Sequence, residues 1–145
     1  MTVAFRNVDA SPGDPVGTWP VEAIVTVIER GLVTDWRPLL REIRDHPRGH
    51  MARVVDAYLE RADVDGATRL FRLVLDDARR SEDDADRTEA AGRVRSCIEA
   101  SGLTAARFAE EIGTSASRLS TYATGRVTPS AALLVRMERV AARRG

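Results

Sequence analysis

Hydroxyl and arginine side chains gather in one short stretch, residues 102–126, which reads GLTAARFAEEIGTSASRLSTYATGR. Thr104 and Ser115 each stand at the start of a short amphipathic segment, where a hydroxyl oxygen can accept hydrogen bonds from free backbone N–H groups. Gly113 separates the two segments and permits a left-handed backbone, so the two predicted helices must cross steeply. The chemistry that these residue types offer is hydrogen bonding and charge pairing with a polar, anionic surface.

The second of these segments predicts a helix with one apolar face and one polar face. Leu119 and Tyr122 form the apolar face. The polar face is short and free of acidic residues, and it carries Ala116, Ser117, Arg118 and Thr121. Small side chains allow close approach to the floor of a DNA major groove, where an arginine can reach O6 and N7 of guanine.

The same stretch carries a resemblance to a known family. It contains Gly-Leu-Thr, then Phe-Ala-Glu-Glu-Ile-Gly, then Thr-Ser-Ala-Ser-Arg-Leu-Ser, and finally Gly and Pro-Ser. In this order the motifs resemble the helix-turn-helix of the Cro/phage-repressor (XRE) family over about residues 102–141, with residues 88–100 as the leading helix. The resemblance implies a lambda-repressor-like bundle whose recognition helix, about 115–123, lies in the major groove of double-stranded DNA.

The resemblance also implies roles for individual residues. The positions that match the family's base-reading residues are Ala116, Ser117 and Thr121, with Arg118 beside them. The positions that match its phosphate contacts are Thr104, Ser115 and Arg126, and Arg107 adds a cation near the DNA backbone. Phosphate contacts would hold the protein in register, and base contacts would set its sequence preference.

Three departures from the family pattern concern individual contacts more than the fold. Ala105 stands where the family often has a glutamine that contacts phosphate, and Arg107 stands where it often has an acid that completes a capping box. Many members pair an arginine in the first helix with a glutamate at the end of the recognition helix. Here Ile98 and Ala123 replace both charges, and an apolar contact can replace such a pair at little cost.

Apolar residues recur at helical spacing along most of the chain, and no segment of four or more residues alternates with period two, so we expect an all-α fold. Four short helices are predicted before residue 80. They run from Pro20 to Gly31, from Thr34 or Asp35 to His46, from Met51 to about Asp63, and from Gly66 onward. Four further helices are predicted at about 91–101, 104–112, 115–123 and from Pro129 onward.

These patterns divide the chain into four parts. Residues 1–18 contain the turn-rich sequence SPGDP and are interpreted as a flexible N-terminal arm. Residues 19–80 are interpreted as a small helical bundle for dimerisation or partner binding. The acidic run 81–86 is interpreted as a junction, either a linker or the exposed first turn of a helix. Residues 87–145 are interpreted as the helix-turn-helix DNA-binding domain, which follows the N-terminal bundle.

Charge is distributed unevenly along the chain. The 145 residues carry 22 arginines, no lysine and 22 acidic residues, for a net charge of zero. Residues 1–86 hold 12 arginines and 17 acids, a net charge of −5, whereas residues 87–145 hold 10 arginines and 5 acids, a net charge of +5. This asymmetry indicates two units with different partners.

The remaining candidate residues favour structural roles. His46 and His50 are predicted to lie in an exposed turn, because a proline and a glycine between them interrupt any helix and no third ligand completes a zinc set. Cys97 is interpreted as a buried structural thiol. Trp19 and Trp36 are expected to fill the N-terminal core, with a small-molecule pocket between helices as the alternative. We expect no catalysis, no metal and no cofactor.

The sequence therefore leads to three hypotheses about function. The first is a sequence-specific DNA-binding transcriptional regulator, a dimeric repressor in the cytoplasm with no membrane association. A variant of it is an antitoxin-like autorepressor whose N-terminal bundle binds a toxin or another product of its operon. The hypothesis from another class is a protein-interaction module that never binds DNA. The absence of an apolar run long enough to cross a bilayer, and of a secretory signal, supports the cytoplasmic assignment.

Overall fold

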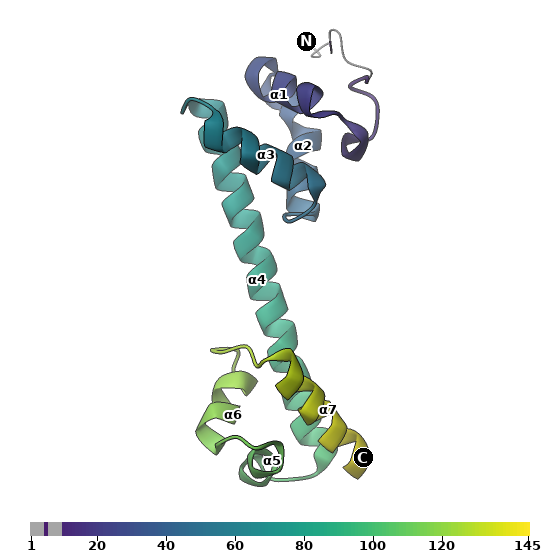
Figure 1. Ribbon diagram of the computed structural model, residues 1–145, viewed down its shortest axis with the longest axis vertical. Helices are drawn as coiled ribbons and strands as arrows, with labels where there is room; N and C mark the ends of the chain where they lie inside the picture. The colour runs from purple at the N-terminus through teal and green to yellow at the C-terminus, as the bar shows by residue number, and fades with distance from the viewer. Residues whose placement is uncertain (1–4, 6–9) are drawn as a thin grey trace. The chain divides into compact units, whose positions relative to one another are not determined.

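The structure is a computed structural model, and it describes Phe5 and residues 10–145. In this part of the chain it contains only helices and no strand, which confirms the prediction of an all-α fold (Figure 1). The elements are η1 (Val16–Thr18), α1 (Val21–Arg30), α2 (Val33–Asp45), α3 (His50–Arg61), α4 (Gly66–Ser101), α5 (Ala105–Ile112), α6 (Ala116–Ala123) and α7 (Ala131–Arg144). None of these helices is long and apolar enough to cross a membrane.

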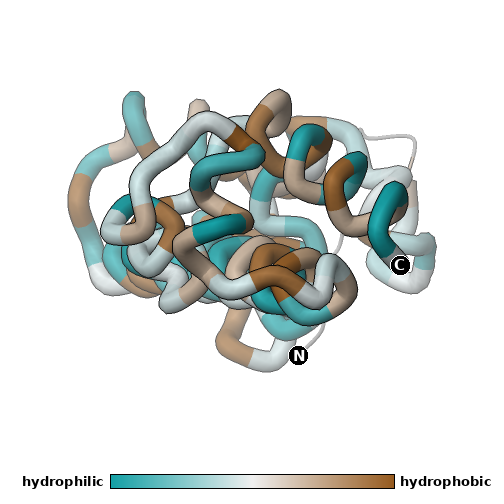
Figure 2. The backbone as a smooth tube through the Cα atoms, turned by 90° about the horizontal axis from the view of Figure 1, so that it is seen from below, coloured by the Kyte–Doolittle hydropathy of each residue, from teal (hydrophilic) through white to brown (hydrophobic). Residues whose placement is uncertain are grey.

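The chain forms two compact units, Met1–Glu82 and Asp83–Gly145. Each unit has an apolar cluster of its own, and α4 supplies residues to both clusters, Phe71 and Leu75 to the first and Val94 and Cys97 to the second. Apolar and polar residues alternate along the helices in Figure 2, as amphipathic helices around two small cores require.

Helix α4 differs from the sequence-based expectation. The acidic run 81–86 was predicted as a linker or as the first turn of a helix, but it lies in the interior of one 36-residue helix. The reason is the absence of any helix breaker, because no glycine or proline occurs between Ala67 and Ala91.

The start of α2 is shifted as well. Thr34 or Asp35 was expected to precede this helix, but the helix begins at Val33. Asp35 lies in the first turn, where its carboxylate accepts a hydrogen bond from the Leu32 N–H at 2.8 Å. An acid in this position satisfies a free N–H group and lies favourably at the positive end of the helix dipole.

Tight packing at the end of α1 builds the core of the N-terminal unit. The Val27 carbonyl accepts hydrogen bonds from the Gly31 N–H at 2.9 Å and from the Trp36 indole Nε1–H at 2.8 Å. A Cβ atom at position 31 would lie 2.3 Å from this carbonyl oxygen, so only glycine fits there. The Trp36 ring in turn meets Phe71 edge to face, which confirms that this tryptophan packs against the core.

The described part of the predicted N-terminal arm packs against the N-terminal unit. Residues 1–4 and 6–9 lie outside the described residues, so the prediction is untested there. Phe5, by contrast, packs edge to face on the buried Trp19 with ring centroids 5.2 Å apart, and the Trp19 indole donates to the Asp14 carbonyl at 3.0 Å. The described part of the segment is therefore anchored, because aromatic burial outweighs the turn-rich composition.

An ion-pair cluster ties α3 to α4. The Asp56 carboxylate contacts Arg72 Nη1 at 2.7 Å and Arg79 Nη1 at 3.0 Å, and Arg79 Nε also donates to the Pro47 carbonyl at 3.0 Å. The hydrogen bond from Arg72 is the main reason why the pKa of Asp56 lies below its ordinary value, and Arg79 lowers it further. The charged form of Asp56 is thus built into the packing of the two helices.

A second polar contact links α1 to α3. The Tyr58 hydroxyl donates to Glu29 Oε1 at 3.0 Å. Burial raises the pKa of Tyr58 to about 12, and the neighbouring carboxylate adds to the shift. The phenol therefore keeps its proton, and with it this hydrogen bond, across the whole physiological range.

The C-terminal unit is a bundle of the end of α4 with α5, α6 and α7. Its cluster contains ten buried residues, and every helix of the unit contributes to it: Val94, Cys97, Phe108, Ala109, Ile112, Leu119, Tyr122, Met137, Val140 and Ala141. Burying one large apolar side chain such as Phe108 contributes about 1.5–3 kcal/mol to the free energy of unfolding. This core holds α5 and α6 at a fixed angle on the surface of the unit.

Candidate nucleic-acid interface

Two capped helices and a tight turn form the centre of the candidate interface. The Thr104 hydroxyl accepts a hydrogen bond from the Arg107 N–H at 3.2 Å and so caps α5. The Ser115 hydroxyl accepts one from the Arg118 N–H at 3.2 Å and caps α6 in the same way. Both predicted caps are confirmed. Each helix thus begins at a fixed residue, although it has only eight residues.

The turn between α5 and α6 depends on one glycine and one arginine. Gly113 ends α5 with φ +79°, the left-handed conformation that the sequence predicts. Arg136, on α7, donates through Nη1 to the Ile112 carbonyl at 3.0 Å. A cation at the C-terminal carbonyls of a helix is favoured by the helix dipole. Sequence reasoning missed Arg136, because a contact between α7 and the turn leaves no local pattern.

Helix α6 presents the predicted polar face. Leu119 and Tyr122 are buried in the core, as expected. Three of the predicted base-reading residues, Ala116, Ser117 and Arg118, are exposed, and Thr121 is half-buried. The Thr121 hydroxyl donates to the Arg118 carbonyl at 2.6 Å, so its oxygen has only acceptor capacity left for a ligand.

Two further hydroxyl residues share this surface and were not predicted. Ser120 is exposed and follows Ser117 by three positions, which places both on one face of α6. Thr124 caps the end of the helix, where its hydroxyl donates to the Ser120 carbonyl at 2.9 Å. The signal that could have found them is the density of hydroxyl residues, because six of the eleven residues from Thr114 to Thr124 are serine or threonine.

A hydrogen bond closes the far end of α6. Arg95 Nη1, on α4, donates to the Ala123 carbonyl at 2.7 Å. Ile98 and Ala123 are partly buried, and each packs against the apolar cluster of the unit. Helix α4 supplies the first helix of this domain, and it nevertheless keeps an arginine, Arg95, one turn before Ile98. Arg95 contacts the end of the recognition helix α6 through a backbone carbonyl.

The acidic side chains of α5 are paired, and several arginines of the unit are not. Arg107 contacts Glu110 at 3.0 Å, and Arg144 contacts Glu111. The predicted phosphate contact Arg107 must therefore exchange a surface ion pair, which costs at most about 1 kcal/mol. Arg118 and Arg126 are exposed and form no ion pair with any described residue.

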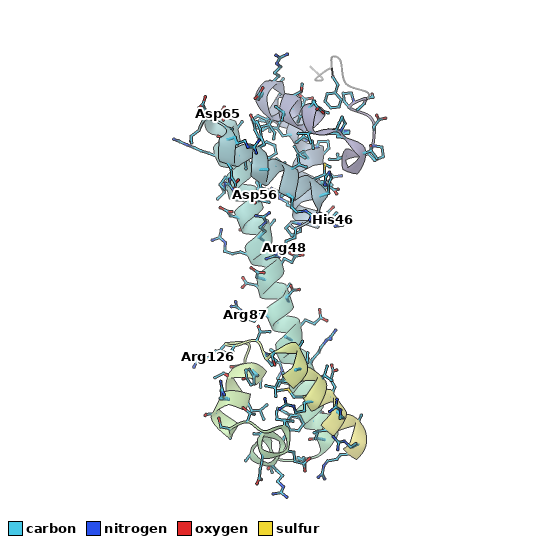
Figure 3. All side chains as sticks on the ribbon, in the orientation of Figure 1. His46, Arg48, Asp56, Asp65, Arg87 and Arg126 are labelled. Atoms are coloured by element: carbon cyan, nitrogen blue, oxygen red, sulfur yellow. The ribbon has the colours of Figure 1, made fainter. Side chains whose placement is uncertain are left out.

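A third arginine lies beside the loop that follows α6. A Cβ atom at Gly125 would lie 3.9 Å from Cγ of Arg87, on α4, so the aliphatic part of Arg87 covers this loop. Figure 3 shows Arg87 and Arg126 at the same edge of the C-terminal unit. Arg87 is exposed, and it extends the cationic surface that sequence reasoning had limited to Arg118, Arg107 and Arg126.

The charge asymmetry becomes smaller when it is counted over the two compact units. Met1–Glu82 holds 12 arginines and 14 acids, a net charge of −2, whereas Asp83–Gly145 holds 10 arginines and 8 acids, a net charge of +2. The difference arises because Asp83, Asp84 and Asp86 fall in the C-terminal unit. Any attraction for an anion must therefore come from where the arginines lie rather than from the total charge.

The other candidate side chains are structural or isolated. Cys97 is buried, as predicted, and burial raises the pKa of its thiol. His46 and His50 are exposed on either side of a turn. Within the described residues no group of three or more histidine, cysteine, aspartate or glutamate side chains is placed to hold a metal ion.

Two short capped helices joined by a left-handed glycine, with the second helix exposed on one face, define a helix-turn-helix unit. Comparison with known proteins agrees, because residues 94–141 match the family model described as helix-turn-helix. The C-terminal part of the chain is therefore a helix-turn-helix domain of the XRE type, as the resemblance implied. No curated protein and no solved structure matches the chain.

Proposed function

We propose that this protein is a sequence-specific regulator that binds double-stranded DNA through α6. The observation that supports the proposal most strongly is the capped, exposed α6, whose outer face carries small polar residues and one unpaired arginine. A helix of this kind fits the major groove, because nothing bulky or acidic on its outer face keeps it from the base edges. The match of residues 94–141 to a helix-turn-helix family supports the same function.

In this proposal the residues of the interface divide into two groups. Arg118 reads a base through its guanidinium, and Ala116, Ser117 and Thr121 approach neighbouring base edges. Because its proton is already donated, the Thr121 oxygen accepts hydrogen bonds, for which the amino groups of adenine and cytosine are the donors. The phosphate contacts are Thr104, Arg107, Ser115 and Arg126.

The finer part of the proposal concerns how the regulator works. One recognition helix per chain contacts a short half-site, so two copies acting together would give useful affinity. We therefore propose a cytoplasmic homodimer that binds two half-sites about 34–36 Å apart in a palindromic or nearly palindromic operator. Occupying such an operator would block transcription.

Binding to duplex DNA at increasing salt tests whether the domain binds DNA at all. Binding is measured by fluorescence anisotropy of a labelled duplex of about 30 base pairs. The logarithm of the binding constant should fall linearly with the logarithm of the salt concentration, because arginines that bind phosphates release counterions from the DNA. Arg126→Ala should reduce the slope by about 1. Arg41→Ala, which removes an exposed arginine of α2, is the matched control and should leave the slope unchanged. Absence of binding at low salt would support the protein-interaction module instead.

A further inference from the structure

A groove on the N-terminal unit is left open between the end of α3 and the start of α4. It has a volume of about 360 Å³, and its apolar walls are Leu59, Ala62, Val64 and Leu73. Val64 is 74% exposed and Leu73 is 62% exposed, the highest values among the large hydrophobic residues that the structure describes. Two exposed aliphatic side chains beside one apolar groove are typical of a protein-protein contact.

The helix that forms one wall of this groove carries a regular pattern of charge. Arg69, Leu73, Asp76 and Arg80 follow one another at spacings of four, three and four residues, so they lie on one face of α4. Asp65 directly precedes the helix and continues this stripe. All five residues are exposed, and Arg69, Asp76 and Arg80 form no ion pair with any described residue. We call these five residues the α4 stripe.

The α4 stripe is complementary to itself when it is reversed. Suppose that α4 of a second copy packs antiparallel on α4 of the first, and that the two helices cross at the point midway between Arg72 and Leu73. Arg69 of one copy and Asp76 of the other then lie opposite each other, each about 5 Å along the helix axis from the crossing point. Asp65 and the second copy's Arg80 meet in the same way, about 11 Å from it. A two-fold axis repeats both pairs, so each cation faces an anion and the two Leu73 side chains meet at the centre.

We propose that the groove and the α4 stripe form an interface with a second copy of this chain. The two Leu73 side chains pack against each other at the centre, where each forms a wall of its own groove, and four ion pairs between Arg69 and Asp76 and between Asp65 and Arg80 fix the antiparallel register. This inference rests on the proposed function, in which two copies act together, and it names the surface through which they associate.

Sedimentation velocity of the full chain without DNA tests the interface by charge reversal. The wild-type chain should be a dimer, and Arg69→Asp and Asp76→Arg should each weaken the dimer about ten-fold or more, because the two-fold axis doubles every repulsion. The double variant Arg69→Asp/Asp76→Arg exchanges the two charges and should restore most of the affinity. Leu73→Asp should abolish the dimer. Circular dichroism would verify that each variant keeps its helical content.

Matched controls make the result specific. Arg41→Asp reverses an exposed charge on α2, outside the stripe, and should leave the dimer intact. Val135→Asp places a charge on the exposed part of α7 and should also leave it intact. A monomeric wild-type chain, a dimer that resists both single reversals, or a double variant that is no better than the singles would overturn the proposed interface. A monomer would leave the groove to a different protein.

The same samples separate this inference from the proposed function. Anisotropy with the labelled duplex measures DNA binding, whereas sedimentation without DNA measures self-association alone. If the wild-type chain forms the dimer but does not bind the labelled duplex, this result would contradict the proposed regulator but not the proposed interface. If the protein binds DNA and its dimer is not weakened by charge reversals in the α4 stripe, this result would contradict the proposed interface but not the proposed regulator.

Discussion

At the scale of single residues, the candidate interface depends on how each hydrogen-bonding group is already used. Thr104 and Ser115 satisfy helix N-termini, and the Thr121 proton is taken by a backbone carbonyl. Arg95 and Arg136 are occupied by carbonyls at the ends of α6 and α5. These two arginines therefore position the helices, whereas Arg118 and Arg126 are among the side chains that remain able to contact a ligand.

The two exposed arginines are predicted to differ in what they recognise. Arg118→Ala should relax the preference at one base pair of the bound sequence by about 1–3 kcal/mol, because a bidentate contact to guanine is lost. Arg126→Ala should weaken binding to all sequences alike, because it removes a phosphate contact. A panel of duplexes with single base-pair changes would measure both effects. An equal loss on every duplex from both substitutions would show that Arg118 touches only phosphate.

Asp56 should make the stability of the N-terminal unit depend on pH. Its pKa is depressed in the folded state, so its ionised form contributes stability above the unfolded-state pKa, near 4, and loses it as the pH falls through the folded value. Asp56→Asn should therefore cost about 1–2 kcal/mol at pH 7, and the cost should become smaller as the pH falls below about 4.

Urea unfolding at pH 7, 5 and 3 would measure this difference. Asp77→Asn changes an exposed aspartate of α4 and is the control, with an expected cost within about 0.5 kcal/mol at every pH. A cost for Asp56→Asn that stays constant between pH 7 and pH 3 would mean that the carboxylate charge does not hold α3 against α4.

At the scale of elements, local signals predicted the helix-turn-helix well. Capping hydroxyls, the glycine at position 113 and the apolar spacing act within one or two turns, so the sequence alone locates α5 and α6 to within a residue. The acidic run 81–86 does contain the boundary between the two units, but the prediction of a linker or a new helix start there was wrong, because no residue in the run breaks a helix. Sequence reasoning also missed Arg95, Arg136 and Arg87, since their contacts join segments distant in the chain.

The turn between α5 and α6 should be sensitive to a single methyl group. Gly113→Ala should lower the free energy of unfolding of the C-terminal unit by about 1–2 kcal/mol, because a left-handed backbone is strained for alanine. The effect is conformational, since the nearest side-chain atom to an added Cβ is Arg136 Nη1 at 3.7 Å.

Gly92→Ala is the matched control for this substitution. Gly92 lies inside α4, where an added Cβ meets only Arg95 Nη2 at 3.8 Å. Alanine should therefore stabilise the protein there by about 0.5–1 kcal/mol. Thermal unfolding followed by circular dichroism would show the opposite signs, and a stabilising Gly113→Ala would refute the strained turn.

At the scale of the whole molecule, the proposed function gives each of the two units its own role. The C-terminal unit carries a net charge of only +2, so any affinity for DNA must come from the positions of exposed arginines such as Arg118, Arg126 and Arg87 rather than from the total charge. The N-terminal unit offers an apolar groove and a charged stripe, and its described residues contain no cluster that could hold a metal ion. Such a division matches a regulator in which one unit reads DNA and the other joins two copies.

Selection of duplex DNA from a genomic library by the purified protein tests the central claim most directly. The wild-type chain should enrich one motif made of two related half-sites, and an Arg118→Ala/Arg126→Ala variant should lose that enrichment while keeping its fold. The spacing of the half-sites would also report the symmetry of the bound protein. Enrichment of no motif by a folded wild-type chain at moderate salt would contradict the claim that α6 reads DNA sequence.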